Sequence, residues 1–349
     1  MNPKKKIAIA LSGGIDSAFC ACFLSRQGYE LVGVTLKMPF FSQDNIKRAG
    51  HVCKKLRIPH HVIDVSDEFS NCIVEYFINS YLRGLTPNPC CLCNRLIKFG
   101  ILLEKIQALG CSLLATGHYA GIIKDKGETY LAKGKAGVKS QEYFLGAVPK
   151  EKLKYVLFPL ENFTKEEVRR ELKISGIYPF RALESREICF IKEKKYKEFI
   201  EERVDDFQKY SGFIKHWDGR TLGKHKGIYA FTYGQREGLG VSWQEPLYVV
   251  DINPESKEVL VAERERVLKD KIVVKDVNWF YPPDSYLNLE VKMRYNSRLL
   301  SCAIENLDSG RICCVLKEAR VIPAPGQLAV FYDKERVVAG GWIARGTGA

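Results

Sequence analysis

The N-terminal segment places the strongest constraint on the fold, because a short apolar run leads directly into a pair of glycines and then into a helical pattern. Ile7 to Leu11 form a continuous apolar run, as does a parallel strand that is covered on both faces. Ser17 to Arg26 carry a helical pattern. The turn Ser12-Gly13-Gly14 is therefore expected at a helix N-terminus, where free backbone N–H groups and the helix dipole favour a phosphate group.

Strand-like and helical segments continue to alternate through residue 116. The strand-like segments are 30–36, 60–65 and 112–116, and the helical segments are 45–56, 69–82 and 98–109. This alternation predicts an α/β fold with a doubly wound parallel sheet, whose ligands bind at the carboxyl ends of the strands. Gly117 to Tyr119 follow a strand and are expected near the glycine turn. The turn is not a Walker A loop, which needs a lysine before its last Ser or Thr.

The second half of the chain changes character. A helix is expected to open near Lys139, a capping box at Thr164 to Glu167 predicts a helix to about residue 175, and 196–202 is helical. From about residue 205 the pattern becomes short strands with frequent glycines. We therefore expect a catalytic α/β domain at 1–204, a central β-rich domain at 205–270 and a β-barrel at 271–349.

Composition limits the cellular setting and the partners. The 349 residues are 46% apolar and 27% charged, with a formal net charge of +13. This excess favours a polyanionic partner, although a basic surface alone would also explain it. The apolar run behind the basic N-terminus is too short for a signal peptide, and no stretch is long enough to span a bilayer. Twelve cysteines without an export signal predict a reducing, cytoplasmic location.

Most of the cysteines lie in apolar helical or strand patterns and are expected to be small buried side chains. These are Cys20, Cys22, Cys53, Cys72, Cys111, Cys302, Cys313 and Cys314. Cys90, Cys91 and Cys93 differ, because they lie in a segment whose two prolines predict an irregular loop at 86–94. The isolated Cys189 also differs.

Three chemistries compete for the C-x-x-C pair formed by Cys90 and Cys93. A zinc site needs further ligands at short range, which the chain does not offer. A redox dithiol at a helix start would have a lowered thiol pKa but would leave the glycine turn unexplained. An iron-sulfur cluster can use three cysteines, with Cys189 as the remote ligand. The absence of any special role is the fourth reading.

The string Ser12 to Ser17 resembles the pyrophosphate loop of the N-type ATP pyrophosphatases, which cleave ATP between its α and β phosphates. Further motifs follow in one order across nearly the whole chain, and together they resemble the tRNA-specific 2-thiouridylase family (MnmA). That family replaces the 2-oxygen of the wobble uridine in tRNA with sulfur. The motifs are Thr86–Pro89, Leu92–Phe99, Ala115–Tyr119, Gln141–Leu145, Ile188–Ile191, Thr232–Gly240, Pro325–Gln327 and Gly340–Gly341.

The resemblance implies roles for individual residues, an adenine nucleotide alpha hydrolase-like fold, and ATP with Mg²⁺ as cofactors. The nucleotide contacts would be Leu11, Ser12, Gly13, Gly14, Ile15, Asp16, Ser17, Leu36 and Gly117, with Asp16 near the magnesium-bound pyrophosphate. The contacts to the target base would be Asn88, Pro89 and Cys90. The other tRNA contacts would be His118, Lys139, Ser140, Gln141, Arg294, Tyr295 and Gln327. Cys93 corresponds to the catalytic cysteine and Cys189 to the persulfide carrier.

Two positions depart from the family pattern. Cys90 and Ser140 each stand where most members have an aspartate. The first change completes a three-thiol set of Cys90, Cys93 and Cys189, which is what a 4Fe-4S cluster with one open iron requires. An open iron could bind hydrosulfide as the sulfur to be delivered. The alternative that the family implies is a persulfide on Cys189, which delivers its sulfur and leaves a disulfide between Cys189 and Cys93. The three thiols favour the cluster over this alternative. The second change puts the tRNA contact at residue 140 in doubt.

The sequence thus predicts an ATP-dependent tRNA thiolase that adenylates uracil O2 and then transfers sulfur. Its partners would be the anticodon arm of tRNA with the wobble uridine, and a sulfur donor such as a cysteine desulfurase, a sulfur carrier or hydrosulfide, with no membrane involved. Two alternatives belong to other classes. One is an ATP pyrophosphatase that adenylates a small metabolite, and the other is a non-catalytic RNA-binding protein.

Overall fold

The computed structural model describes residues 5–135, 140–177, 188–191, 196–281, 288–308, 310–317 and 320–346. The chain forms two compact units. Unit 1 contains Met1–Cys72, Cys90–Phe190 and Glu335–Val337. Unit 2 contains Ile73–Pro89, Ile191–Lys334 and Val338–Ala349.

A five-stranded sheet forms the centre of unit 1. Its strands, in spatial order, are β3 (His60–Asp64), β2 (Glu30–Lys37), β1 (Lys6–Ala10), β4 (Leu113–Ala115) and β7 (Val156–Leu157). Every pairing is parallel, which confirms the predicted doubly wound parallel sheet. The strand order reverses between β1 and β4, so their carboxyl ends form the switch point where such sheets bind ligands.

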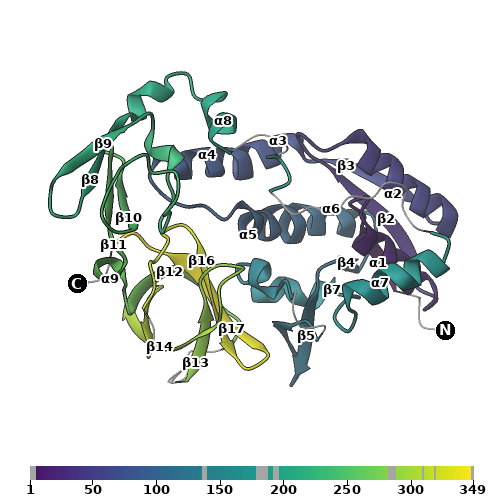
Figure 1. Ribbon diagram of the computed structural model, residues 1–349. Coiled ribbons are helices and arrows are strands. Elements are labelled where there is room, and N and C mark those ends of the chain that lie inside the picture. The colour runs from purple at the N-terminus through teal and green to yellow at the C-terminus, as the bar shows by residue number, and fades with distance from the viewer. Residues whose placement is uncertain are drawn as a thin grey trace. The chain divides into compact units, whose positions relative to one another are not determined.

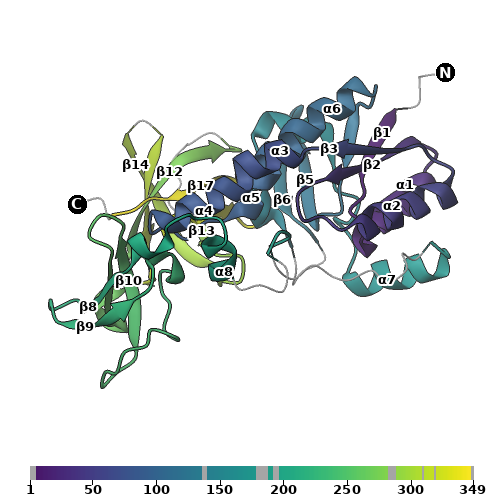
Figure 2. The ribbon, with the colours of Figure 1, turned by 90° about the horizontal axis from the view of Figure 1, so that it is seen from above.

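Helices cover both faces of this sheet. Figures 1 and 2 show α1 (Ile15–Ser25), α2 (Gln43–Leu56) and α7 (Lys165–Ile174) on one face, with α3 (Ser66–Phe69) and α6 (Leu102–Ala108) on the other. The apolar side of α1 packs on β1, and its Phe19 ring meets Phe163 edge-on with ring centroids 4.9 Å apart. Burial of such aromatic side chains supplies most of the free energy that fixes helices to a sheet.

The helix that contains the C-x-x-C pair begins earlier than the sequence predicts. The segment 86–94 was expected to be an irregular loop, but α5 (Pro89–Cys93) runs directly into the π-helical segment η2 (Asn94–Ile101) and then into α6. The expectation was wrong because proline is well tolerated in the first turn of a helix, where its missing N–H has no partner to lose. The cysteines are therefore held on a helix.

Three other segments refine the expectations for the first 205 residues. The predicted helix at 69–82 consists of η1 (Ser70–Val74), a π-helical turn, followed by α4 (Glu75–Leu82). A hairpin of β5 (Ala120–Asp125) and β6 (Glu128–Lys133) was not predicted. The helix expected near Lys139 is a 3₁₀ turn, η3 (Glu142–Leu145), and Lys139 itself lies outside the described residues. The further elements are η4 (Lys150–Tyr155) and α8 (Tyr196–Glu201).

Unit 2 contains a four-stranded sheet with the order β10 (Leu247–Asn253), β11 (Glu258–Glu263), β8 (Gly212–His216) and β9 (Thr221–His225). The β11–β8 pair is parallel and its neighbours are antiparallel. Its inner face buries Ile214, Val249 and Val261 against Ile228 and Phe231. The short helical elements around it are η5 (Phe207–Tyr210), η6 (Ile228–Ala230) and α9 (Arg264–Val267).

A closed six-stranded barrel follows, as the sequence predicts. Its strands, in spatial order, are β12 (Lys271–Trp279), β15 (Arg311–Leu316), β14 (Leu300–Asp308), β13 (Leu289–Lys292), β16 (Leu328–Asp333) and β17 (Arg336–Ile343), and β17 pairs with β12. Cys302 and Cys314 lie in its core. The cysteines expected to be buried are buried, apart from Cys72, which is half-buried. Within the described residues, no helix is both long enough and apolar enough to cross a membrane.

The capping box of α7 yields a stability prediction. Thr164 Oγ1 accepts a hydrogen bond from the Glu167 N–H (3.2 Å), and the Glu167 carboxylate accepts one from the Thr164 N–H (2.7 Å). Thr164→Ala should lower the free energy of unfolding by about 1 kcal/mol, because the Glu167 N–H in the first turn of the helix loses its acceptor. Urea denaturation measures this loss. Thr164→Ser, which keeps the oxygen, should match the wild type, and equal losses in both variants would contradict the capping account.

Candidate active site

The glycine turn at the carboxyl end of β1 has a backbone that only glycine fits. Gly13 has φ of +76°, and a Cβ at this position would lie 2.5 Å from the backbone oxygen of Asn45. Arg48 of α2 donates through Nε to the Gly13 carbonyl (3.2 Å). The turn is thus pressed against the start of α2, with Gly13 buried and Gly14 half-buried.

The helix behind the turn has an N-terminus suited to an anion. Gly14 is the N-cap of α1, and no side chain in the described structure caps this helix. The Ser17 hydroxyl points back and donates to the Gly14 carbonyl (3.1 Å), while its oxygen receives the Ser12 N–H (3.2 Å). The serine hydroxyls therefore stabilise the turn at the N-terminus of α1, the end of a helix that favours phosphate oxygens.

The end of β4 meets this turn, as the strand order predicts. A Cβ at Gly117 would lie 3.1 Å from the Ser17 nitrogen, so the two backbones are in close contact. The Tyr119 hydroxyl donates to Asp16 Oδ1 (2.8 Å) and fixes the carboxylate in the first turn of α1. Sequence reasoning named Asp16 but gave Tyr119 no role. Its position four residues after the end of β4 was the available signal.

The other predicted nucleotide contacts lie on the same strands or on the turn. Leu11 is buried directly after β1, and its carbonyl accepts a hydrogen bond from the Thr35 hydroxyl (2.9 Å). Ile15, the first residue of α1, is half-buried, as is Leu36 near the carboxyl end of β2. All three belong to unit 1.

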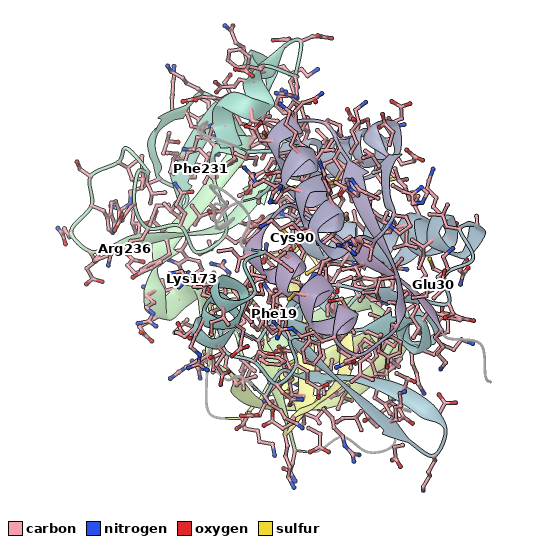
Figure 3. All side chains as sticks on the ribbon, turned by 90° about the vertical axis from the view of Figure 1, so that its right-hand side faces the viewer. Phe19, Glu30, Cys90, Lys173, Phe231 and Arg236 are labelled. Carbon is pink, nitrogen blue, oxygen red and sulfur yellow. The ribbon has the colours of Figure 1, made fainter. Side chains whose placement is uncertain are left out.

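The structure brings the thiols of Cys90, Cys93 and Cys189 within electrostatic range of one another. Figure 3 labels Cys90, which is half-buried on α5, whereas Cys93 is buried and Cys189 is exposed. Burial, and then the neighbouring Cys189, raises the pKa of Cys90 to about 11 despite the opposing charge of Lys98. Burial raises the pKa of Cys93 to about 12, again against Lys98, with Cys189 and Cys90 adding to the rise.

Lys98 is a site residue to which sequence reasoning gave no role. It lies five residues after Cys93 on the π-helical segment η2, and π-turns occur often at functional sites. Its ammonium group opposes the rise in the thiol pKa values at Cys90 and Cys93. The site therefore places the charge of Lys98 within range of the thiols of Cys90 and Cys93.

The donor set for an iron-sulfur cluster is not assembled. Within the described parts of the chain, no three His, Cys, Asp or Glu side chains lie close enough together to hold a metal ion. The three thiols influence one another electrostatically, but they do not converge on one point as ligands at thiolate–metal distances must. The arrangement thus does not fit a cluster.

His118 is half-buried and carries no charge at neutral pH. Burial, and then the charge of Lys98, holds its pKa well below the usual histidine range. Its Nδ1 lies 2.8 Å from the Thr116 hydroxyl, and its ring packs near Phe99 and Phe158. A neutral imidazole of this kind can contact RNA by hydrogen bonding or stacking, but not as a cation.

Ser140 and Gln141 bind the backbone beside the site. The Ser140 hydroxyl accepts the Gly134 N–H (2.7 Å) and lies 3.3 Å from the Tyr119 carbonyl, to which it donates. Gln141 Oε1 accepts the Tyr119 N–H (3.1 Å). Both side chains therefore hold Tyr119, the residue that orients Asp16.

The remaining predicted tRNA contacts lie in unit 2. Gln327 Nε2 donates to the carbonyls of Thr86 and Pro87 (3.0 Å each) and so holds the segment just before Asn88, which is buried, and Pro89. Arg294 donates to the Tyr233 carbonyl (2.7 Å). Lys292 lies 5.2 Å from the Tyr295 ring centroid, as in a cation–π pair.

A parallel sheet with a phosphate-type turn at its switch point, followed by two β-rich domains, defines a nucleotide-binding α/β protein with β-barrel extensions. Three family profiles match the chain along its length. They are described as tRNA methyl transferase HUP domain (residues 5–193), tRNA methyl transferase PRC-barrel domain (residues 197–263) and aminomethyltransferase beta-barrel domain (residues 269–343).

Curated relatives are similar to the chain over nearly its full length. The tRNA-specific 2-thiouridylase MnmA of Syntrophotalea carbinolica is 41% identical, covering 97% of this chain and 99% of its own. Its counterparts in Geotalea uraniireducens (38%; 98% and 96%) and Leptospira interrogans (40%; 99% and 96%) are similarly close. The chain belongs to the tRNA-specific 2-thiouridylase MnmA family.

The glycine turn allows a test with a matched control. Gly13→Ala should lower the free energy of unfolding by at least about 2 kcal/mol for two reasons. The new Cβ would clash with the backbone of Asn45, and alanine is strained in the left-handed backbone conformation of residue 13. Gly14→Ala should cost less than about 1 kcal/mol, because φ at Gly14 is −93° and its nearest neighbour is the Ser12 hydroxyl at 3.3 Å. Chemical denaturation compares the two variants. Equal losses would contradict the close-contact account.

Proposed function

We propose that this protein carries out ATP-dependent 2-thiolation of the wobble uridine of tRNA. The observation that carries the proposal is that unit 1 contains two features together. One is a phosphate-type turn in which Gly13 has no room for a side chain, and the other is the pair of thiols of Cys93 and Cys189, which lie in electrostatic range of each other. The relatives named tRNA-specific 2-thiouridylase support it. The turn would bind the ATP that activates the uracil oxygen, and the thiols would supply the sulfur that replaces this oxygen.

The first step activates the uracil. Its O2 attacks the α-phosphorus of ATP, the bond to the β-phosphate oxygen breaks, and pyrophosphate leaves. The N–H groups at the start of α1 stabilise the phosphate oxygens, which gain charge in the transition state. Asp16, oriented by Tyr119, would hold Mg²⁺, because carboxylate oxygens are ligands that this ion prefers, and the ion would neutralise the pyrophosphate charge.

The second step transfers sulfur. A sulfur donor first leaves a persulfide on Cys189, whose terminal sulfur attacks C2 of the adenylated uracil and expels AMP. The thiolate of Cys93 then attacks the Cys189 sulfur, and the S–S bond breaks toward the base. The products are 2-thiouridine and a Cys93–Cys189 disulfide, which an external thiol must reduce. The positive charge of Lys98 favours the anionic sulfur forms that these attacks require.

A tRNA substrate also accounts for the charge of the chain. The formal net charge of +13 favours a polyanion. The wobble base must leave its stack to reach reacting groups, which costs little in an anticodon loop. We assign the chemistry to residues 1–204, and phosphate and shape recognition of the anticodon arm to 205–270 and 271–349.

Two other functions make different predictions. An ATP pyrophosphatase that acts on a metabolite would release pyrophosphate without tRNA, and it would need neither Cys93 nor Cys189. A non-catalytic RNA-binding protein would bind tRNA but release no pyrophosphate. Assays of pyrophosphate release with and without tRNA therefore separate both from the proposed function.

Cysteine variants test the sulfur-transfer step. Cys93→Ser and Cys189→Ser should each lower the rate of tRNA thiolation by at least about a hundredfold. Cys189→Ser removes the sulfur that carries the persulfide, and Cys93→Ser removes the thiolate that attacks it. Cys72→Ser, a half-buried cysteine of the same unit, should leave the rate unchanged. Mass spectrometry of nucleosides from digested tRNA measures 2-thiouridine. A Cys93→Ser protein with full activity would refute the mechanism.

Anaerobic purification decides between the persulfide route and a cluster. We expect substoichiometric iron and sulfide, and continued thiolation by Cys90→Ala, because no three ligands converge in the described structure. Iron and acid-labile sulfide at cluster stoichiometry, lost together with activity in Cys90→Ala, would instead establish the cluster that the three thiols suggested.

A further inference from the structure

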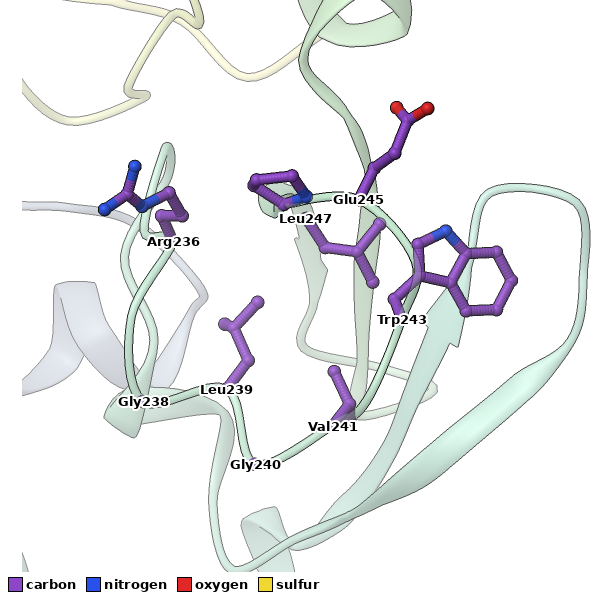
Figure 4. Close-up of a pocket in the computed structure, with 9 residues that line it drawn as sticks. Arg236, Gly238, Leu239, Gly240, Val241, Trp243, Glu245 and Leu247 are labelled. Carbon is purple, nitrogen blue, oxygen red and sulfur yellow. The ribbon is translucent and has the colours of Figure 1, made fainter.

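The motif Thr232–Gly240 has no part in the proposed chemistry, yet the structure gives it a defined shape. Its residues form one side of an open basin of about 290 Å³ in unit 2. Figure 4 shows the side chains of Leu239, Val241 and Leu247 converging, with Arg236 and Glu245 on opposite sides. Leu239 and Leu247 are themselves buried, so the open surface of the basin comes mainly from its backbone and from Arg236 and Glu245, which carry opposite charges.

Internal hydrogen bonds hold the first half of the loop in place. The Gly234 N–H donates to the Val249 carbonyl (2.8 Å), and the Val249 N–H donates to the Gln235 carbonyl (3.0 Å), which ties the loop to β10. The Gln235 side chain accepts the Thr232 N–H (3.0 Å) and donates to the Glu237 carbonyl (3.0 Å). The loop is thus preformed, and its conformation does not depend on a ligand.

Two glycines keep the mouth of the basin open. Gly238 and Gly240 have φ of +69° and +71°, and a Cβ at either would meet no atom within 4 Å. A side chain at either position would therefore meet no steric clash, but the left-handed backbone conformation of both residues favours glycine. A ligand can approach this backbone closely, since no side chain covers it.

The far wall is rigid as well. Trp243 donates through Nε1 to Glu263 Oε1 (3.0 Å), and its ring packs on His216 with centroids 4.3 Å apart. Arg220 lies 4.5 Å from the same ring centroid. The indole is therefore fixed at the edge of the basin.

We propose that this basin binds one unpaired nucleotide of the tRNA, at a site separate from the one that receives the wobble uridine. The inference rests on the proposed function, which supplies the RNA. The open backbone at Gly238 and Gly240 suits the hydrogen-bonding edge of a nucleobase, and Arg236 suits a phosphate. Its ion pair with Glu237 (3.2 Å) is largely exposed and is easily exchanged. Glu245 can accept hydrogen bonds from a ribose 2′-hydroxyl or a base amino group.

Three variants test the proposal with unmodified tRNA transcript as the probe. Arg236→Gln removes the cation, and Val241→Trp fills the basin. Each should raise KM for tRNA about 5- to 20-fold with kcat within twofold, because the lost contact is equal in ground and transition states. Arg264→Gln is the matched control, since it removes an exposed arginine of α9 in the same unit and should change neither constant.

Salt dependence and footprinting give independent readouts. Arg236→Gln should lower the slope of log affinity against log salt by about one, whereas Arg264→Gln should leave it unchanged. Hydroxyl-radical footprinting should show a protected nucleotide outside the wobble position that loses its protection in Arg236→Gln. This measurement decides the matter if Val241→Trp does not fold.

The inference would be overturned if Arg236→Gln and Val241→Trp both kept the wild-type KM, salt slope and footprint. That result would leave the proposed function intact. An equal effect of Arg264→Gln would also overturn it, because the effect would then come from net charge. A wild-type protein that neither binds nor thiolates tRNA would instead refute the proposed function.

Discussion

The turn after β1 exists in its present form only because residue 13 has no side chain. Its backbone is left-handed, and the position of a Cβ is taken by the carbonyl of Asn45. This contact places the start of α2 against the turn, and Arg48 then bonds to the Gly13 carbonyl. The close approach of Gly117 brings in the end of β4. Three segments far apart in the sequence therefore converge on one anion-binding backbone.

The sulfur side of the site rests on a different physical effect. Burial disfavours the thiolates of Cys90 and Cys93, and Lys98 alone among the named groups opposes that effect at both. The raised pKa values favour the protonated thiols of Cys90 and Cys93, which protects these two cysteines from adventitious oxidation. A substrate or donor that changes the solvation or charge around them would shift this balance toward the reactive form.

The sequence was sufficient for the parallel sheet, the glycine turn and the barrel, because each follows from local periodicity or from glycine chemistry. It was insufficient at Pro89, where a residue that usually interrupts structure begins a helix. It also did not reveal the Tyr119–Asp16 hydrogen bond, or the way Gln327 holds the carbonyls of Thr86 and Pro87. These contacts join residues that are 103 and about 240 positions apart, so no local pattern encodes them.

The same limit explains the cysteines. Their types and spacing made a three-thiol metal set reasonable, but ligand convergence is a property of distance and direction that spacing does not determine. In the described chain the three thiols come near one another without forming such a set. The proposed function, oxygen activation followed by attack of protein-bound sulfur, gives each of the two sides of the site a part.

Isotope transfer tests that central claim most directly. A tRNA with ¹⁸O at O2 of its wobble uridine would be thiolated in a single turnover, and the AMP and pyrophosphate analysed by mass spectrometry. If uracil O2 attacks the α-phosphorus, the label must appear in AMP, in step with 2-thiouridine. Label recovered in water or pyrophosphate, with unlabelled AMP, would show that O2 is never adenylated and would contradict the account.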